Sequence, residues 1–292
     1  MSRRTAVITG AAGGLGQAIA RRLLADGFDI VAVTRNARSA AATRETLVAG
    51  AHGHAVHALH ADLVDRDAVR ALAAQLRDTV GQVDVLVNNA GAAFAGYGET
   101  TDGMELTHAL NHLTPFHLTH LALDNGLLAP DARIINISSG LMARGRLDRG
   151  EPDVTGISWR HRYSQITVYG TAKLANLLAT TALADRLPGG MSAYSADPGV
   201  IRTGFHTKAG GLVKLASSLG AIMAQPPAKA AHTPALLAMA GTSPTPNGGY
   251  FAKGAATTPP KTALDADLAT LVYERTARAL GLAARPATAP RR

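Results

Sequence analysis

Tyr169 and Lys173 stand four residues apart in a stretch, residues 165–187, that is predicted to be helical. Residues with this spacing lie on one face of a helix. A tyrosine hydroxyl is a weak acid or base at its usual pKa of about 10, and a nearby cation favours its phenolate form. A serine at the end of a predicted strand, either Ser138 or Ser139, could donate to the same substrate oxygen. Together these groups predict proton transfer at that oxygen, although Tyr and Lys at this spacing are common by chance.

A glycine-rich turn, residues 9–16 (TGAAGGLG), follows the first predicted strand and opens the first predicted helix. Glycines allow the backbone to turn tightly and to approach a pyrophosphate without Cβ atoms in the way. The helix N-terminus offers free N–H groups and the positive end of its dipole. Such turns also occur for packing reasons alone. The position after the first strand favours a dinucleotide, with backbone contacts from Gly10, Ala12, Gly14, Leu15 and Gly16.

The end of the second predicted strand indicates which dinucleotide is used. An acidic residue there would bind the ribose 2′-hydroxyl of NAD and repel the 2′-phosphate of NADP. This chain has Thr34, Arg35 and Asn36 instead, with Arg38 close by. A guanidinium suits a phosphate by charge and by its fork of donors. We therefore expect NADP(H) to be favoured over NAD(H), with Arg35 as the contact, although a surface arginine after a strand is also common.

Short β-rich segments alternate with longer helical ones along the chain. Strands are predicted at residues 5–9, 29–34, 55–60, 83–88, 133–138, 192–196 and 249–251, and helices up to residue 26 and at 37–49, 65–80, 102–125 and 165–187. This alternation is typical of a parallel sheet that is covered on both faces. The prediction is an α/β chain with a single Rossmann-fold domain, doubly wound, over residues 1–284, followed by a flexible tail at residues 285–292.

Composition excludes several other classes of protein. The chain has 292 residues, 47% of them hydrophobic and 17% charged, which fits a folded globular protein. Its net charge of +8 is partly terminal, and no basic helix is interleaved with aromatics, so no nucleic-acid partner is expected. The absence of cysteine excludes disulfides and cysteine metal sites. No signal peptide or apolar stretch of about 18–20 residues is found, so we expect a cytoplasmic protein without a membrane partner.

A series of motifs, in order along the chain, resembles the short-chain dehydrogenase/reductase family from about residue 5 to residue 280. They are the glycine turn, the Asp62-Leu63 pair, the NNAG segment 88–91, Asn111 in the long helix, the strand INISS 135–139 before YGTAK 169–173, and DPGVIRT 197–203. The resemblance implies that Tyr169, Lys173, Ser139 and Asn111 are catalytic. It further implies cofactor contacts from Tyr169, Lys173, Asp62, Leu63, Asn89, Ala90, Gly91, Pro198, Gly199, Val200 and Thr203.

The spacing of 30 residues between Ser139 and Tyr169 is longer than in most of that family. In this the chain is similar to the retinol-dehydrogenase-like branch, which has a long insertion between the two residues. Residues 140–163 are expected to project outward over the cleft as part of the substrate wall, and residues 204–224 to form a second substrate loop. Candidate substrate contacts are Phe94, Leu141, Trp159, His161 and Phe205.

Two features of the long helix carry further expectations. Pro115 should kink it locally and disturb the placement of Asn111. His108, His112 and His120 are expected at the surface or at an interface with a second subunit, and a homo-oligomer is an open alternative. No metal site is expected, since the histidines at positions 52, 54, 57 and 60 point to different faces of a strand pattern.

The expected activity is that of an NADP(H)-dependent oxidoreductase acting on CH–OH groups, a ketoreductase or carbonyl reductase. It would move a hydride between nicotinamide and a carbonyl or secondary alcohol, and bacterial secondary metabolism is one setting for it. Two alternatives remain open: a non-redox isomerase, cyclase or dehydratase on the same scaffold, and a cofactor-sensing binding protein. The presence of Tyr169, Lys173 and Ser139 together favours the redox enzyme.

Overall fold

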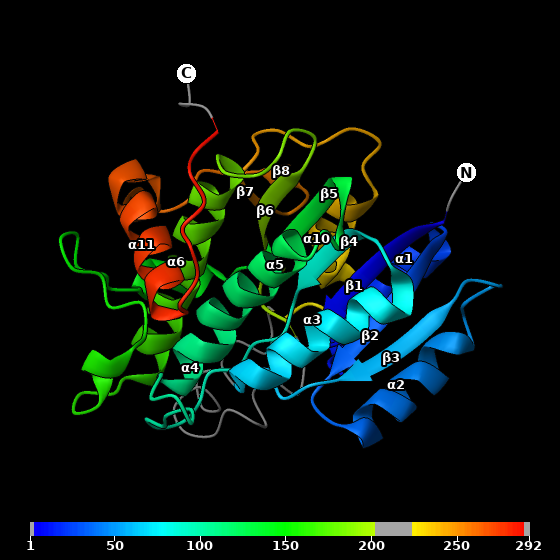
Figure 1. Cartoon of the computed structure of the whole chain (residues 1–292), viewed down its shortest axis with the longest axis horizontal. Coiled ribbons are helices and arrows are strands. Elements are labelled where there is room, and N and C mark those ends of the chain that lie inside the picture. The colour runs from blue at the N-terminus through cyan, green and yellow to red at the C-terminus, as the bar shows by residue number, and fades with distance from the viewer. Residues whose placement is uncertain (1–2, 202–223, 289–292) are drawn as a thin grey trace.

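A computed structural model describes residues 3–201 and 224–288 of the chain. Its centre is an eight-stranded sheet in the order β3-β2-β1-β4-β5-β6-β7-β8 (Figure 1). Strands β1 to β7 are parallel, and β8 is antiparallel to β7. The strands are β1 (Arg4–Thr9), β2 (Phe28–Thr34), β3 (Val56–His60), β4 (Val83–Asn88), β5 (Leu128–Ile137), β6 (Ser192–Asp197), β7 (Tyr250–Ala252) and β8 (Ala255–Ala256).

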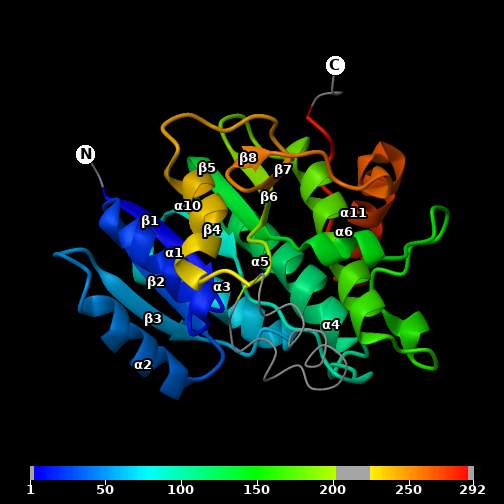
Figure 2. The same cartoon turned by 180° about the vertical axis from the view of Figure 1, so that it is seen from behind.

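Helices cover both faces of the sheet, which confirms the predicted α/β fold. One face carries α3 (Arg66–Val80), α4 (Leu106–His108), α5 (Thr114–Asp124), α6 (Gln165–Ala184) and α11 (Ala266–Ala279). The other carries α1 (Gly14–Ala25), α2 (Ala37–Val48), α9 (Pro227–Ala230) and α10 (His232–Met239) (Figure 2). Neighbouring strand residues feed opposite cores: Val7 joins one apolar cluster, and Ala6 and Ile8 join the other. Both faces of the central strands are therefore buried, as apolar runs such as residues 83–86, with a single Asp, indicate.

The strand order reverses between β1 and β4. In open α/β sheets, ligands bind beyond the carboxyl ends of the strands at such a reversal. The glycine turn follows β1 at this point, and the loops after β4, β5 and β6 open on the same edge of the sheet. The topology therefore brings the predicted cofactor and catalytic residues to one edge.

The predicted helix at 102–125 is interrupted. Between α4 and α5 lies a π-helical turn, η1 (Ala109–Leu113), in which the Thr114 N–H donates to the Ala109 carbonyl. Pro115 has no N–H to offer the Asn111 carbonyl four residues earlier, so a regular α-helical ladder cannot pass this point. The disturbance expected from Pro115 takes the form of this wider turn, and Asn111 lies inside it.

The histidines of this helix are not at a surface, and that expectation was wrong. His108, His112, His117 and His120 are at most 1% exposed. The His112 Nε2 lies 2.8 Å from the Thr276 hydroxyl, and the His120 Nε2 lies 2.7 Å from the hydroxyl of Tyr273. Both partners belong to α11, which packs on this side of the molecule. The chain's own C-terminal helix therefore buries the histidines that were expected to face solvent or a second subunit.

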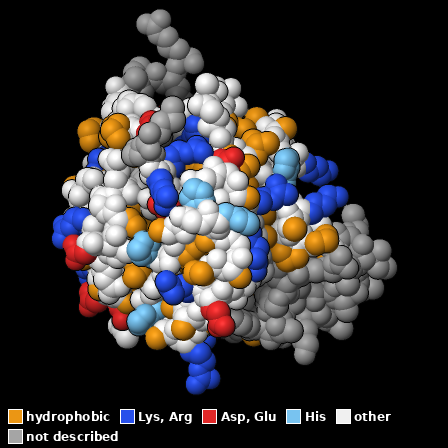
Figure 3. Space-filling view, turned by 90° about the vertical axis from the view of Figure 1, so that its right-hand side faces the viewer, with side chains coloured by type: hydrophobic (Ala, Val, Ile, Leu, Met, Phe, Trp, Pro, Cys, Tyr) orange, Lys and Arg blue, Asp and Glu red, His pale blue; other side chains and the backbone are white. Residues whose placement is uncertain are grey.

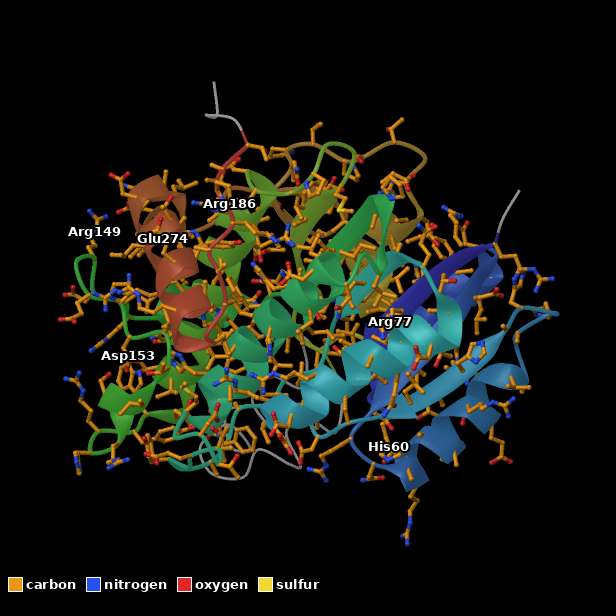
Figure 4. The ribbon with its side chains drawn as sticks, viewed as in Figure 1. His60, Arg77, Arg149, Asp153, Arg186 and Glu274 are labelled. Carbon is orange, nitrogen blue, oxygen red and sulfur yellow. The ribbon has the colours of Figure 1, made fainter. Side chains whose placement is uncertain are left out.

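The insertion at 140–163 packs onto the body in its middle part and does not simply project outward as expected. The Thr155 carbonyl accepts from the Glu105 N–H at 2.9 Å, and the Val154 carbonyl lies 3.1 Å from His108 Nδ1. Figure 4 shows Arg149 and Asp153 on the same side of the molecule as Glu274 of α11. Arg149 pairs with Asp265, the N-cap residue of α11, at 3.4 Å. The insertion thus covers α4 and contacts α11.

Residues 285–288, the first residues of the predicted flexible tail, contact the body of the molecule. The Arg285 side chain pairs with Asp124, and the Thr288 N–H donates to the Asp185 carbonyl at 2.8 Å. Residues 285–288 are therefore tied to the ends of α5 and α6, while residues 289–292 lie outside the described part.

The face formed by α1, α2 and β3, whose Lys/Arg-type residues are all arginines, bears scattered basic side chains with acidic, polar and apolar ones among them (Figure 3). Among the described residues, no helix is both long and apolar enough to cross a membrane.

Candidate active site

Tyr169 and Lys173 lie on one face of α6, as their spacing predicted, and both are buried. The Lys173 ammonium donates to the Ile137 carbonyl at the end of β5, at 2.7 Å, and lies 5.7 Å from the centre of the Tyr169 ring. Burial lowers the pKa of Lys173 to about 8, and the charge of Asp197 opposes that fall. Burial raises the pKa of Tyr169 above its usual value. Near neutral pH the pair is therefore a protonated phenol beside a cation that loses its proton easily.

The two serines after β5 have different surroundings. The Ser138 hydroxyl is buried and lies 3.7 Å from the sulfur of Met142. The Ser139 side chain hydrogen-bonds with Tyr169 and accepts from the Leu141 N–H at 3.3 Å. The contact with Tyr169 favours Ser139 over Ser138 as the serine of the site.

Asn111 reaches the same site from η1 and is fully buried. Its amide nitrogen donates to the carbonyls of Ala92 and Thr107 at 2.7 and 2.8 Å. Its amide oxygen has no partner among the described residues. A Cβ atom on Gly91 would lie 2.6 Å from this oxygen and 3.6 Å from Lys173 Nζ. The absence of a Cβ atom at Gly91 thus lets the Asn111 amide oxygen approach the backbone on the side where the Lys173 ammonium also lies.

The glycine turn is packed so closely that two of its glycines have no room for a side chain. Gly10 has a φ of +66°, and a Cβ atom on it would lie 2.8 Å from the Ala90 Cα. A Cβ atom on Gly16 would lie 2.6 Å from the Gly10 carbonyl oxygen. No side chain caps the N-terminus of α1, and Ala12 and Gly14 are exposed beside it. The free N–H groups therefore fit the anionic part of a dinucleotide.

Asn89 holds this turn in place. Its side-chain amide donates to the carbonyls of Thr9 and Gly10 at 2.8 and 3.2 Å. The backbone N–H groups of Asn89 and Ala90 both donate to the Thr9 hydroxyl at 3.0 Å. Asn89 was predicted as a cofactor contact, and in the described contacts its side chain binds the turn itself.

Arg35 follows β2 at the same edge and is exposed, as is Arg38. Neither forms an ion pair within residues 3–201 and 224–288. Asn36 between them caps α2 by accepting from the Ser39 N–H at 2.9 Å. The cap fixes the start of α2 and leaves both guanidiniums available to an anion.

The remaining predicted cofactor residues lie on the loops after β3 and β6. Asp62 is exposed, whereas Leu63 is buried and its carbonyl accepts from the Thr114 hydroxyl. After β6, Pro198 is buried and Gly199 is exposed. Val200 is 56% exposed. Thr203, predicted with this group, lies outside the described residues.

The predicted substrate contacts divide into two groups. Leu141, two residues after Ser139, is 40% exposed, and His161 is also exposed. Phe94 is half-buried, and its carbonyl accepts from the Tyr163 hydroxyl at 2.7 Å. Trp159 is buried, and its ring packs under the Arg162 guanidinium at 5.4 Å, which favours the packing role for it. Phe205 lies outside the described residues.

Sequence reasoning missed a buried polar ladder behind the site. The Asn88 amide donates to Asn136 at 2.8 Å, and the Asn136 amide donates to the Thr180 hydroxyl at 2.8 Å. The ladder joins β4, β5 and α6, which carry the site. Polar residues at buried strand ends were its only signal in the sequence. The contact of Asp197 with Tyr250, discussed below, was missed as well.

The comparisons with known proteins agree with this geometry. Residues 4–147 match the family model described as short chain dehydrogenase. Human retinol dehydrogenase 13 is 32% identical over 96% of this chain and 86% of its own length. A candidate daunorubicin C-13 ketoreductase, DnrU, of Streptomyces sp. (strain C5) is 35% identical over 97% of this chain and 94% of its own.

Solved structures agree as well. A short chain dehydrogenase from Burkholderia cenocepacia J2315 in complex with NADP has a TM-score of 0.67 and 26% identity, covering 87% of this chain and 98% of that one. A blue fluorescent protein from a metagenomic library in complex with NADPH has a TM-score of 0.65 and 30% identity, covering 87% and 98%. With the fold, the site and these relatives together, this chain belongs to the short-chain dehydrogenase/reductase family, in its retinol-dehydrogenase-like branch, and is an oxidoreductase of CH–OH and carbonyl groups.

Proposed function

We propose that the chain is an NADP(H)-dependent carbonyl reductase that reduces a ketone or aldehyde to the alcohol. The observation that carries the proposal is the shared hydrogen bond of Tyr169 and Ser139 above the buried ammonium of Lys173. A setting in secondary metabolism is part of the proposal and is supported by the similarity to DnrU.

In the proposed reaction, the carbonyl oxygen accepts hydrogen bonds from Ser139 and Tyr169. NADPH, held by the glycine turn, would supply the hydride for the carbonyl carbon and leave as NADP. Tyr169 gives its proton to the oxygen, and the product is the alcohol. The charge of Lys173 stabilises the phenolate that Tyr169 becomes. Asn111, through its unpartnered amide oxygen, is the group proposed to hold a water molecule that returns a proton to the site.

The preference for NADP(H) rests on Arg35 and Arg38. Both are exposed at the end of β2, and no acidic residue replaces them there. Structural neighbours in complex with NADP or NADPH support this choice. A 2′-phosphate would gain charge-assisted hydrogen bonds that a 2′-hydroxyl cannot make.

The test is a deuterium-transfer assay with the purified full chain. NADPH that carries deuterium at the transferable C4 position is incubated with aldehydes, aromatic ketones and quinones, and the products are examined by mass spectrometry. The proposal predicts an alcohol with deuterium on the former carbonyl carbon. Binding of NADPH without reduction of any carbonyl would favour the cofactor-sensing protein. A product with no deuterium and no change in oxidation state would favour the isomerase, cyclase or dehydratase.

A further inference from the structure

The carboxylate of Asp197 lies beside the proposed catalytic pair and has no assigned role. Asp197 ends β6, whose neighbour β5 ends just before the two serines. The pairing of Ala196 with Ile137 brings Asp197 level with Ser138. A Cβ atom on Gly140, the residue after Ser139, would lie 3.6 Å from Asp197 Oδ2. The carboxylate is therefore held at the edge of the sheet where the reaction is proposed.

Each oxygen of this carboxylate has a donor. The Gly199 N–H donates to Oδ1 at 2.7 Å, and the Tyr250 hydroxyl donates to Oδ2 at 2.6 Å. Burial raises the pKa of Tyr250, and the carboxylate raises it further, so the phenol remains the donor across the working pH range. Tyr250 opens β7, on the far side of β6 from β5. The two donors fix the orientation of a carboxylate that is only 8% exposed.

The charge of Asp197 is not neutralised by contact. Within the described part of the chain, Asp197 forms no salt bridge, and the nearby Lys173 ammonium donates to a backbone carbonyl instead. The charge therefore acts through a poorly hydrated interior, where screening is weak. The groups that it reaches are Tyr169 and Lys173 on α6 and Tyr250 on β7.

The charge of Asp197 shifts the pKa of Tyr169 and the pKa of Lys173 in the same direction. A negative charge stabilises the ammonium of Lys173 and disfavours the phenolate of Tyr169, so it raises the pKa of both. Burial acts differently on the two groups: it already favours the neutral phenol but works against the ammonium. Asp197 thus opposes the effect of burial on the pKa of Lys173.

We propose that Asp197, held by Tyr250, is a positioning residue that keeps Lys173 protonated and sets the pH at which the Tyr169–Lys173 pair loses its first proton. The consequence for turnover rests on the proposed function, whereas the consequence for Lys173 does not. Because Tyr169 and Lys173 titrate together, the pH at which the reaction rate falls reflects the pair rather than either residue alone.

The experiment follows Lys173 directly. The chain has six lysines, so the NMR spectrum of protein labelled with ¹³C at lysine Cε contains only a few signals. The signal that is absent from the spectrum of Lys173→Arg belongs to Lys173. Asp197→Asn keeps the shape and the hydrogen-bonding atoms but removes the charge. In this variant we expect the pH midpoint of the Lys173 titration to fall by about one unit. The matched control is Asp84→Asn, which removes the charge of a carboxylate near the start of β4, at the opposite end of the strands. It should leave the Lys173 midpoint unchanged.

Tyr250→Phe completes a double-mutant cycle. If Tyr250 acts through Asp197, it moves the Lys173 midpoint in the wild-type background and has no effect in the Asp197→Asn background. An equal effect in both backgrounds, or none in either, would contradict that link. If Asp197→Asn does not fold, as judged by circular dichroism, Asp197→Ser replaces it.

The alkaline limb of kcat/KM for carbonyl reduction should move to lower pH by the same amount in Asp197→Asn. An unchanged Lys173 midpoint and an unchanged limb would overturn the inference. A shifted midpoint in a protein that reduces no carbonyl would retain the electrostatic role of Asp197 and reject the proposed function, so the two failures are distinguishable.

Discussion

The amide oxygen of Asn111 and the ammonium nitrogen of Lys173 both lie beside Gly91, at 2.6 and 3.6 Å from the point that a Cβ atom on this glycine would occupy. One residue comes from a π-helical turn and the other from α6, more than sixty residues later in the chain. The absence of a side chain at position 91 lets the Asn111 amide approach the backbone on the same side as the Lys173 ammonium.

Gly91→Ala should therefore impair turnover more than folding. The added methyl group would displace the Asn111 amide, and a displacement of about 1 Å at a reacting centre can cost about 10²-fold in rate. Gly96→Ala is the control, because a Cβ atom there meets nothing within 4 Å. Steady-state reduction rates and thermal melting of both variants check this. Equal rates for the two variants would show that the space beside Gly91 is not used.

The cofactor prediction concerns Arg35. Arg35→Ala should weaken NADPH binding by about tenfold or more, since one charge-assisted hydrogen bond contributes about 1.5–3 kcal/mol. NADH binding should be unchanged, because NADH lacks the 2′-phosphate. Isothermal titration with both cofactors measures this, with Arg21→Ala, an exposed arginine on α1, as the control. Equal affinity of the wild-type protein for the two cofactors would reject the preference.

The buried histidines predict a loss of stability in acid. Burial lowers the pKa of His112 to about 3, and that of His117 and of His120 to about 4. Each folded pKa lies below the unfolded value of about 6.5, so the unfolded chain takes up protons first as the pH falls. The free energy of unfolding should be insensitive to these groups above pH of about 7. It should fall below pH of about 6.5, by up to about 1.4 kcal/mol per pH unit for each histidine.

Urea titrations across this pH range measure the slope. His117 is the histidine to replace, because neither of its ring nitrogens has a hydrogen-bond partner among the described residues. His117→Leu should reduce the slope by about one proton. A slope that is the same in both proteins would mean that His117 is not buried in its neutral form.

The insertion prediction concerns Asp153. Its carboxylate accepts from the N–H groups of Thr155, Gly156 and Ser158 at 2.8–3.0 Å. Burial works against its ionisation, but the hydrogen bonds from Ser158 and Thr155 hold its pKa below the usual range. Asp153→Asn should lower the free energy of unfolding by about 2 kcal/mol, because a half-buried charged acceptor of three backbone N–H groups is lost.

Asp148→Asn is the control in the same insertion. Asp148 also accepts two backbone N–H groups, but it is exposed, so its replacement should leave stability nearly unchanged. Chemical denaturation of both variants decides the matter. If the two variants are equally stable, the contacts of the insertion with α4 and α11 do not stabilise the fold.

Much of this architecture could be predicted from local pattern. The strand and helix alternation, the glycine turn and the spacing of Tyr169 and Lys173 each follow from rules that act within a few residues. The burial of His112 and His120 could not be predicted, because it depends on α11, which is about 150 residues away in the sequence. The same holds for Tyr250 and Asp197, which meet only when β7 pairs with β6.

The path of the insertion at residues 140–163 could not be predicted from local sequence either. Its length indicated a structure between Ser139 and Tyr169, but its direction depends on contacts of Val154 and Thr155 with α4 that no local rule specifies. Leu141 and His161 remain predicted substrate contacts, and Trp159 is better explained by packing.

The central claim is that Tyr169 transfers the proton, and Tyr169→Phe tests it most directly. The change removes the hydroxyl and keeps the ring, so folding and NADPH affinity should be retained. General acid catalysis typically contributes about 10²–10⁴-fold, and kcat for carbonyl reduction should fall by about that factor. The measurement is single-turnover reduction with saturating NADPH, alongside NADPH affinity for the same preparation. A variant that binds NADPH normally and reduces the carbonyl at near wild-type rate would contradict the account.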